Sequence, residues 1–201
     1  GIKEPNDFIG KTIISRDAGP GDATFLREFF DSIGVDPNDV NIVDYATPNY
    51  LVRGLESGEV DGGYYHHMAV ERVVTRGLAD IYQPFDWVNP ELSHALLIFR
   101  RDYYDSHREE IRKFLAGYVD RIRYEQEHPV EEWYLHRGVK ERGLQTHIRF
   151  AGMDIPRFSY PPLIEISLLN QMQDLLQKHR QVDYPPVDLA PYIDQSLLHE
   201  L

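Results

Sequence analysis

The feature that most constrains the fold is an alternation of short apolar runs and amphipathic helix patterns between residues 11 and 67. Apolar runs of strand length lie at Thr12–Ser15, Val40–Tyr45 and Val60–Tyr65. Segments of about ten residues with helical periodicity separate these runs. Strands that alternate with helices form βαβ units, in which neighbouring strands lie parallel. The sequence therefore predicts an α/β fold with a mainly parallel sheet flanked by helices.

The two intervening helices have recognisable starts and stops. Asp22 is predicted as the N-cap of the first helix, because its carboxylate can accept hydrogen bonds from the free amides of the first turn. Gly34 supplies the left-handed residue that commonly ends a helix. A Thr47-Pro48 pair is predicted to start the second helix, which ends near Gly58.

Ligands of parallel α/β sheets bind beyond the carboxyl ends of the strands. The first strand is followed by residues 17–24, where Gly19 and Gly21 precede a helix N-terminus. Glycines let the backbone approach a ligand, and the free helix amides favour an anionic group. The loop lacks the lysine of a Walker loop and the GxGxxG dinucleotide pattern. An ordinary tight turn is the alternative interpretation of this loop.

The third strand runs into a cluster of rings, Tyr64-Tyr65-His66-His67. Aromatic side chains offer stacking surface, and imidazoles add donors, acceptors and titration near neutral pH. Core packing at a strand end is the alternative for the tyrosines. His67 and Glu71 can share a helical face, but no third ligand is evident in the sequence. We therefore predict no metal ion and no cofactor.

Composition and charge exclude several classes of protein. The formal net charge is −12, and the adjacent basic pairs Arg100-Arg101 and Arg112-Lys113 form no longer basic block, so no nucleic-acid footprint is present. The chain has no cysteine, which excludes disulfides and thiolate chemistry. Its 201 residues are 42% hydrophobic, as in a globular protein, and no apolar run reaches the ~20 residues that span a bilayer. Neither a nucleophile elbow nor an HExxH motif occurs, so we predict no enzymatic activity.

The pattern changes near residue 100, from alternating elements to helix. A fourth strand is predicted at residues 80–83, and a buried antiparallel strand at residues 94–99. A long helix should follow a capping box at residues 106–109, with an apolar stripe that includes Phe114 and Leu115. Further helices are predicted at residues 130–136, 162–178 and 190–199. The predicted domains are an α/β ligand-binding lobe at residues 1–104 and a helical part at residues 105–201.

Four motifs in order carry a resemblance to a known family. Asp7-Phe8-Ile9-Gly10-Lys11-Thr12-Ile13 resembles the D-L-x-G-K-x-I motif of ABC-transporter solute-binding proteins, in the subfamily for sulfonates, nitrate and thiamine-pyrimidine precursors. Residues 35–40 are similar to its G-(L/V)-D-P-x-D-V turn, and residues 55–62 to its L-x-x-G-x-V-D-A segment. Residues 111–129 are similar to its long helix that closes in N-P.

This resemblance implies a type II periplasmic-binding-protein fold that captures a small molecule in an interlobe cleft and delivers it to an ABC permease. It implies a periplasmic or extracellular location, with or without a lipoprotein anchor. Family members have most of a first lobe before the D-L-x-G-K motif. That lobe is expected on the same or another chain, with residues 105–201 packed against it. Without it, part of the apolar stripe, or of the C-terminal helix around residues 163–176, should be exposed. The isolated chain should then associate with itself or with another chain, or bind a hydrophobic dye, and it should bind ligand poorly.

The resemblance also points to a class of ligand. Gly19-Pro20-Gly21-Asp22 stands where sulfonate binders have a Gly-Ser pair, and the Tyr64-Tyr65-His66-His67 cluster stands where many members have Trp-Glu-Pro. An aromatic or heterocyclic ligand, such as a thiamine-pyrimidine precursor, is therefore expected. The alternatives are an enzyme resembling thiamine-pyrimidine synthases, whose cysteine-rich segment this chain lacks, and a sensing domain of a larger receptor. The predicted ligand-binding residues are Arg16, Asp17, Gly19, Gly21, Asp22, Ala23, Thr24, Tyr64, Tyr65, His66 and His67.

Overall fold

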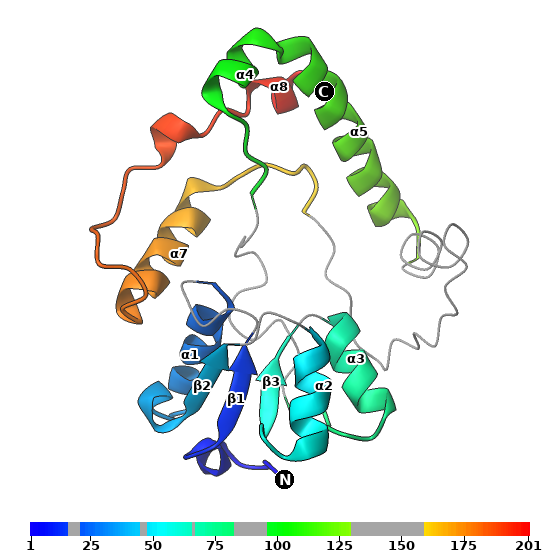
Figure 1. Cartoon of the computed structure of the whole chain (residues 1–201). Coiled ribbons are helices and arrows are strands. Elements are labelled where there is room, and N and C mark those ends of the chain that lie inside the picture. The colour runs from blue at the N-terminus through cyan, green and yellow to red at the C-terminus, as the bar shows by residue number, and fades with distance from the viewer. Residues whose placement is uncertain (16–20, 45–47, 66, 83–95, 130–158) are drawn as a thin grey trace. The chain divides into compact units, whose positions relative to one another are not determined.

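The computed structural model describes residues 1–15, 21–44, 48–65, 67–82, 96–129 and 159–201 (Figure 1). The chain divides into two compact units. Unit 1 comprises Gly1–Leu92, Ile148–Met153 and Gln171–Pro186. Unit 2 comprises Ser93–His147, Asp154–Asn170 and Val187–Leu201. Within the described part of the chain, none of the helices is both long and apolar enough to cross a bilayer.

Unit 1 is built on a parallel sheet. Its described strands are β1 (Thr12–Ser15), β2 (Asn41–Asp44) and β3 (Gly62–Tyr64), in the order β2-β1-β3. Ile13 of β1 lies opposite Ile42 of β2 and Gly62 of β3. The predicted α/β fold with a parallel sheet flanked by helices is therefore confirmed, and the central strand is the first in sequence (Figure 1).

Three α-helices follow the three strands. They are α1 (Asp22–Ser32), α2 (Pro48–Ser57) and α3 (His67–Thr75), and two short 3₁₀ helices occupy Pro5–Phe8 and Pro37–Asp39. The structure makes Gly21, not Asp22, the N-cap of α1. The amide of Thr24 donates to the carbonyl of Gly21 at 3.0 Å, so the first turn already includes Asp22. Gly34 has a φ of +78°, as a left-handed helix stop requires.

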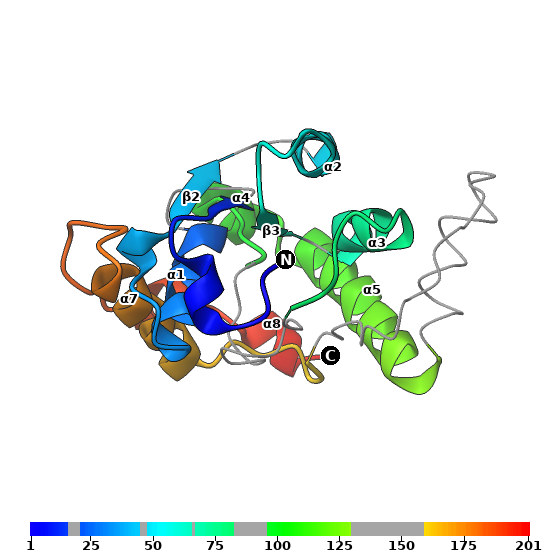
Figure 2. The ribbon, with the colours of Figure 1, turned by 90° about the horizontal axis from the view of Figure 1, so that it is seen from below.

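Side-chain alternation along the strands decides which helix covers which face. Ile13 of β1 and Ile42 of β2 contact a buried cluster with Phe29 and Phe30 of α1. The next residue of β1, Ile14, belongs instead to the cluster of α2 and α3, with Leu51. Successive residues of a strand point to opposite faces, so a continuous apolar run is buried on both sides. Figure 2 shows α1 apart from the pair α2 and α3.

A glycine in β3 allows α2 to approach the sheet closely. A Cβ atom on Gly63 would lie 2.5 Å from Cγ2 of Ile14 and 2.6 Å from Cδ1 of Leu51. Both distances are far below van der Waals contact, so a side chain at this position would push α2 off the sheet. The close packing of this face therefore depends on Gly63.

Two predicted strands are wrong in their described parts. Residues 80–82 and 96–100 are irregular, and neither pairs with a strand in the described part of the chain. The run predicted to be buried is instead exposed at Leu96, Leu97 and Ile98. An apolar run can be buried, but it forms a strand only where another strand is available to pair with it. Gln83 and residues 94–95, which belong to the same predictions, lie outside the described residues.

The described helices of unit 2 include α4 (Arg101–Ser106), α5 (Arg108–Glu127), a 3₁₀ turn (Ala190–Tyr192) and α8 (Ser196–His199). Ile111 and Leu115 of α5 and Leu197 of α8 form its buried cluster. The predicted capping box is wrong, because the hydroxyl of Ser106 donates to the carbonyl of Asp102 at 2.6 Å and ends α4. His107 then caps α5 without a side-chain hydrogen bond.

The C-terminal helices differ in extent from the prediction. The helix predicted at residues 162–178 is α7 (Ile166–Lys178), which starts four residues later. Its C-terminal part, from Gln171, belongs to unit 1, and its first turn belongs to unit 2. The helix predicted at residues 190–199 is split into the 3₁₀ turn and α8. The helix predicted at residues 130–136 lies outside the described residues.

Candidate functional site

The three strands end together at one edge of the sheet. Ser15 is the last residue of β1 and lies opposite Asp44 of β2 and Tyr64 of β3, which end those strands. The segments that follow these ends are the ones predicted to hold a ligand. Of the predicted site, Arg16, Asp17, Gly19 and His66 lie outside the described residues. His67 is the first residue of α3, and its side chain is not described.

The first turn of α1 brings the remaining loop residues to this edge. Gly21 caps the helix, and Asp22, Ala23 and Thr24 form its first turn. Ala23 and Thr24 are completely buried. The Oγ1 atom of Thr24 is buried and has no hydrogen-bond partner in the described part of the chain. A buried hydroxyl without a partner carries an energetic penalty of about 1–3 kcal/mol, so a group that bonds it there would be favoured.

The two tyrosines of the predicted site diverge. Tyr64 is partly buried and contacts the cluster of α1 on one side of the sheet. Tyr65 is buried in the cluster of α2 and α3 on the other side. They are consecutive residues at the end of β3, so strand alternation sends their rings apart. One ring therefore lies on the same side of the sheet as α1 and the other on the opposite side.

The opposite end of the sheet is held by an acidic anchor. The Asp61 carboxylate accepts a hydrogen bond from the Thr12 amide at 3.0 Å and forms an ion pair with the Lys11 ammonium at 3.3 Å. The hydrogen bond from the Thr12 amide is the main cause that lowers the pKa of Asp61 from its ordinary value. This contact joins the start of β1 to the residue before β3, and so supports the register that aligns their carboxyl ends.

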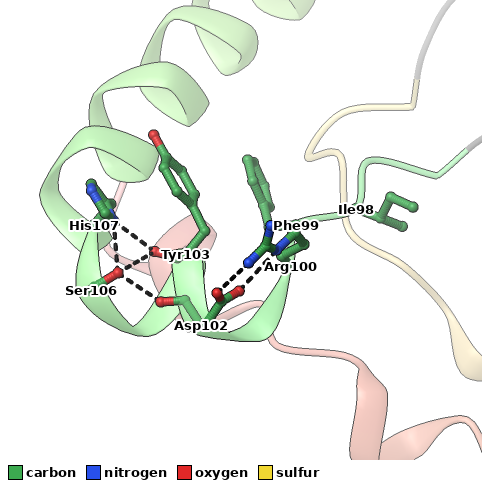
Figure 3. A pocket seen from close by; sticks show the side chains of 7 residues that line it. All are labelled: Ile98, Phe99, Arg100, Asp102, Tyr103, Ser106 and His107. Carbon is green, nitrogen blue, oxygen red and sulfur yellow. Dashed lines mark hydrogen bonds and ion pairs between the residues drawn. The ribbon is translucent and has the colours of Figure 1, made fainter.

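A shallow hollow of about 330 Å³ occurs in unit 2 (Figure 3). Residues 98–100 line it, together with Asp102, Tyr103, Ser106 and His107. Its polar groups satisfy one another. Arg100 pairs with Asp102, and the rings of Tyr103 and His107 stack with centroids 4.2 Å apart. Because these groups are already paired, the hollow offers a ligand little beyond exposed apolar surface.

A second polar cluster lies in unit 1, away from the carboxyl edge, and sequence reasoning missed it. Glu28 and Asp31 of α1 meet Lys178 and His179 at the end of α7. Nε2 of His179 is 2.8 Å from Oε2 of Glu28, and Nζ of Lys178 is 3.1 Å from Oδ2 of Asp31. The partners are separated by 150 residues of sequence, so no local pattern relates them.

Comparison with known proteins supports the resemblance. The sequence pattern of the family described as NMT1/THI5 like matches residues 1–132, about two thirds of the chain. No curated protein matches the chain significantly. The matched segment contains β1, β2, β3 and the helices between them, as well as α5. The chain therefore belongs to the NMT1/THI5-like family, which is part of the type II periplasmic-binding-protein family.

Proposed function

We propose that this chain is the solute-binding component of an ABC importer, and that it binds a small aromatic or heterocyclic molecule without transforming it. The observation that carries this proposal is the common carboxyl edge of β1, β2 and β3, where Ser15, Asp44 and Tyr64 lie side by side. Ligands of parallel sheets bind at this edge. Membership of the NMT1/THI5-like family supports a solute-binding role.

The groups at this edge favour a ligand that combines a ring with hydrogen-bonding substituents. Tyr64 is only partly buried, so its ring retains surface for stacking. The Thr24 hydroxyl at the start of α1 is buried and has no hydrogen-bond partner in the described part of the chain, so a solute that reaches it could accept or donate a hydrogen bond there. A substituted pyrimidine of the thiamine-precursor type offers both a flat ring and polar substituents. Arg16, Asp17, Gly19, His66 and His67 remain predicted contacts.

The second wall of the cleft would come from a first lobe, on the same or another chain. Unit 2 exposes apolar side chains that such a lobe could cover, namely Leu96, Leu97, Ile98 and Phe114. Contiguous exposed apolar surface is uncommon on proteins that act alone. A permease would receive the solute, and the protein would work in the periplasm or outside the cell.

Replacement of Thr24 by Val tests the site. The substitution removes the buried hydroxyl while keeping the side-chain volume nearly constant, so the fold should be retained or stabilised by about 1 kcal/mol. Affinity for a hydroxymethyl-substituted aminopyrimidine should fall by about tenfold, the equivalent of one hydrogen bond. Isothermal titration calorimetry of both proteins measures the affinity, and thermal unfolding measures the stability.

Thr12→Val is the matched control, because Thr12 lies at the opposite end of β1 from the predicted site. Its affinity for the aminopyrimidine should equal that of the wild type. Equal affinity of the Thr24→Val variant and the wild type would overturn the assignment of Thr24. Tighter binding of nitrate or an alkyl sulfonate than of the aminopyrimidine would overturn the ligand class.

An enzymatic role is the second candidate, because the THI5 part of the family description relates to thiamine synthesis. The binding proposal predicts that the aminopyrimidine is recovered unchanged after prolonged incubation with the protein. Mass spectrometry of the protein and of the small molecule distinguishes a binding role from an enzymatic role. A modified side chain or a converted pyrimidine would favour the enzyme.

A further inference from the structure

The polar cluster between α1 and the end of α7 has the composition of a metal site. Glu28 and Asp31 lie one helical turn apart on α1 and point the same way. The end of α7 supplies the imidazole of His179, and one ligand atom from each of these three residues lies within 4.8 Å of the others. In Figure 1 the relevant end of α7 is the C-terminal end of the orange helix.

His179 is held firmly by the turn that ends α7. The amide of Gln181 donates to the carbonyl of Leu176 at 2.8 Å, and the amide of Arg180 to the carbonyl of Gln177 at 2.9 Å. These two bonds form a Schellman motif, with Arg180 in the left-handed region at a φ of 52°. The side chain of His179 is only 6% exposed. The imidazole is therefore positioned before any ligand arrives.

The cluster already contains a cation of its own. The Lys178 ammonium lies 2.5 Å from Oε2 of Glu28 and 3.1 Å from Oδ2 of Asp31. Nε2 of His179 lies 4.0 Å from Oδ2 of Asp31. Lys178 thus competes for the carboxylate oxygens that would bind a metal ion. Because its side chain is 48% exposed on a flexible stem, it can withdraw into water with its charge intact.

We propose that Glu28, Asp31 and His179 form a binding site for a divalent transition-metal ion of the zinc class, and that Lys178 competes with the metal for it. One imidazole and two carboxylates suit zinc-class ions, whereas calcium and magnesium prefer oxygen ligands alone. Water completes the coordination. On binding, the hydrogen that Nε2 donates to Glu28 is exchanged through water to Nδ1, so that Nε2 can offer its lone pair to the ion, while Lys178 leaves as the ammonium.

A bound ion would fasten residues 171–186 to the α/β core. Glu28 and Asp31 belong to the same helix whose first turn carries Thr24, so the metal would also stiffen the element that starts at the candidate ligand edge. A ligand that binds only the folded state raises stability in proportion to its occupancy. This inference does not rest on the proposed function, because metal binding can be measured without any solute.

The experiment uses the 201-residue chain after treatment with a chelator and dialysis. Zinc chloride is titrated by calorimetry, and the melting temperature is measured with and without zinc. We expect one ion per chain at this site and a higher melting temperature. Lys178→Met removes the competing ammonium and should tighten zinc binding by about tenfold. Asp31→Asn removes one ligand at a partly exposed position and should weaken binding by a similar factor.

Two matched substitutions control for the other histidines and carboxylates of the chain. His199 lies on the exposed surface of α8, and Glu56 forms an exposed ion pair with Arg76. His199→Gln and Glu56→Gln should bind zinc as the wild type does. His179→Gln should abolish zinc binding at the site. When cobalt replaces zinc as a spectroscopic probe, the absorption bands of the bound cobalt should likewise be absent from this variant.

Zinc binding that is unchanged in both Asp31→Asn and His179→Gln would show that the ion sits elsewhere and would overturn the site. A Lys178→Met variant that binds no zinc would also overturn it. Circular dichroism confirms that each variant is folded before titration. Asp31→Asn keeps the test decisive if His179→Gln fails to fold, because the side chain of Asp31 is 35% exposed.

Discussion

Among the described residues, the two units differ in how completely their apolar side chains are covered. In unit 1, a buried cluster lies on each face of the sheet, one with α1 and one with α2 and α3. In the described part of unit 2, the core cluster consists of three buried residues, Ile111, Leu115 and Leu197. Phe114, directly beside Leu115 on α5, is 53% exposed. The apolar stripe of α5 is therefore broader than the described elements of its own unit cover.

This difference teaches how sequence periodicity relates to burial. A strand in a parallel sheet is covered on both faces by the helices that its own connections supply. Ile13 and Ile14 are therefore both buried, each by a different helix. A helix such as α5 needs neighbours from other elements, and in the described part of unit 2 these include α8 and α4. A periodic apolar stripe thus indicates that one face of a helix can be buried, but it does not indicate which element covers that face.

The largest expected effect tests whether unit 1 holds the main core. Ile14 is completely buried, so Ile14→Ala should cost about 3 kcal/mol of unfolding free energy through lost burial and the cavity left behind. Leu97→Ala in the exposed run of unit 2 should cost close to nothing. Urea denaturation followed by circular dichroism measures both. Equal losses of unfolding free energy in the two variants would contradict the stated difference between the units.

The next effect contrasts two glycines. Gly63→Ala places a methyl group against Ile14 and Leu51 and should destabilise the protein by about 1–3 kcal/mol. Gly117 lies inside α5, and a Cβ there meets nothing within 4 Å. Gly117→Ala should therefore stabilise by up to about 1 kcal/mol through helix propensity. Opposite signs in thermal unfolding sharpen the comparison, and a neutral Gly63→Ala would contradict the close approach of α2.

A smaller effect concerns acid stability. Partial burial raises the pKa of Glu28, but hydrogen bonds from Lys178 and His179 outweigh it and hold the pKa below its ordinary value of 4.5. A lowered folded pKa gives stability that is fully present above 4.5 and is lost as the pH falls through the folded pKa. Glu28→Gln should therefore be less stable than the wild type at neutral pH and flatten the acid limb of the stability curve.

Glu109 in unit 2 is the matched control for Glu28. It pairs with Arg112 on the exposed surface of α5, where solvent screens the interaction. The acid limb of Glu109→Gln should follow that of the wild type. Unfolding curves collected from pH 3 to 7 compare the three proteins. A larger change for Glu109→Gln than for Glu28→Gln would reverse the ranking of the two contacts.

The sequence was sufficient for the first half of unit 1 because its signals are local. Strand-length apolar runs and the stop at Gly34 locate β1, α1 and β2 within a few residues. The N-cap was misplaced by one residue, since Asp22 and Gly21 both suit such a position. The capping box at Ser106 was wrong because the same hydroxyl can bond backward to Asp102 and end α4 instead.

The remaining differences depend on tertiary contacts. The run 96–99 has strand composition, yet its burial would require a partner strand that the sequence around it does not specify. The meeting of Glu28 with His179 depends on where α7 ends against α1, which no periodicity encodes. All of the predicted ligand contacts stay predictions, and Arg16, Asp17, Gly19 and His66 among them lie outside the described residues.

The central claim is that a solute binds at the carboxyl edge of the sheet, and NMR tests it most directly. Spectra of the ¹⁵N-labelled chain are recorded as a hydroxymethyl-substituted aminopyrimidine is added, because chemical shifts report even weak binding by one wall of a cleft. We predict that the amide signals of residues 21–24 and 64–65 shift together with one affinity, while those of residues 98–107 do not. Shifts confined to residues 98–107, or no shifts at residues 21–24 and 64–65, would contradict the account.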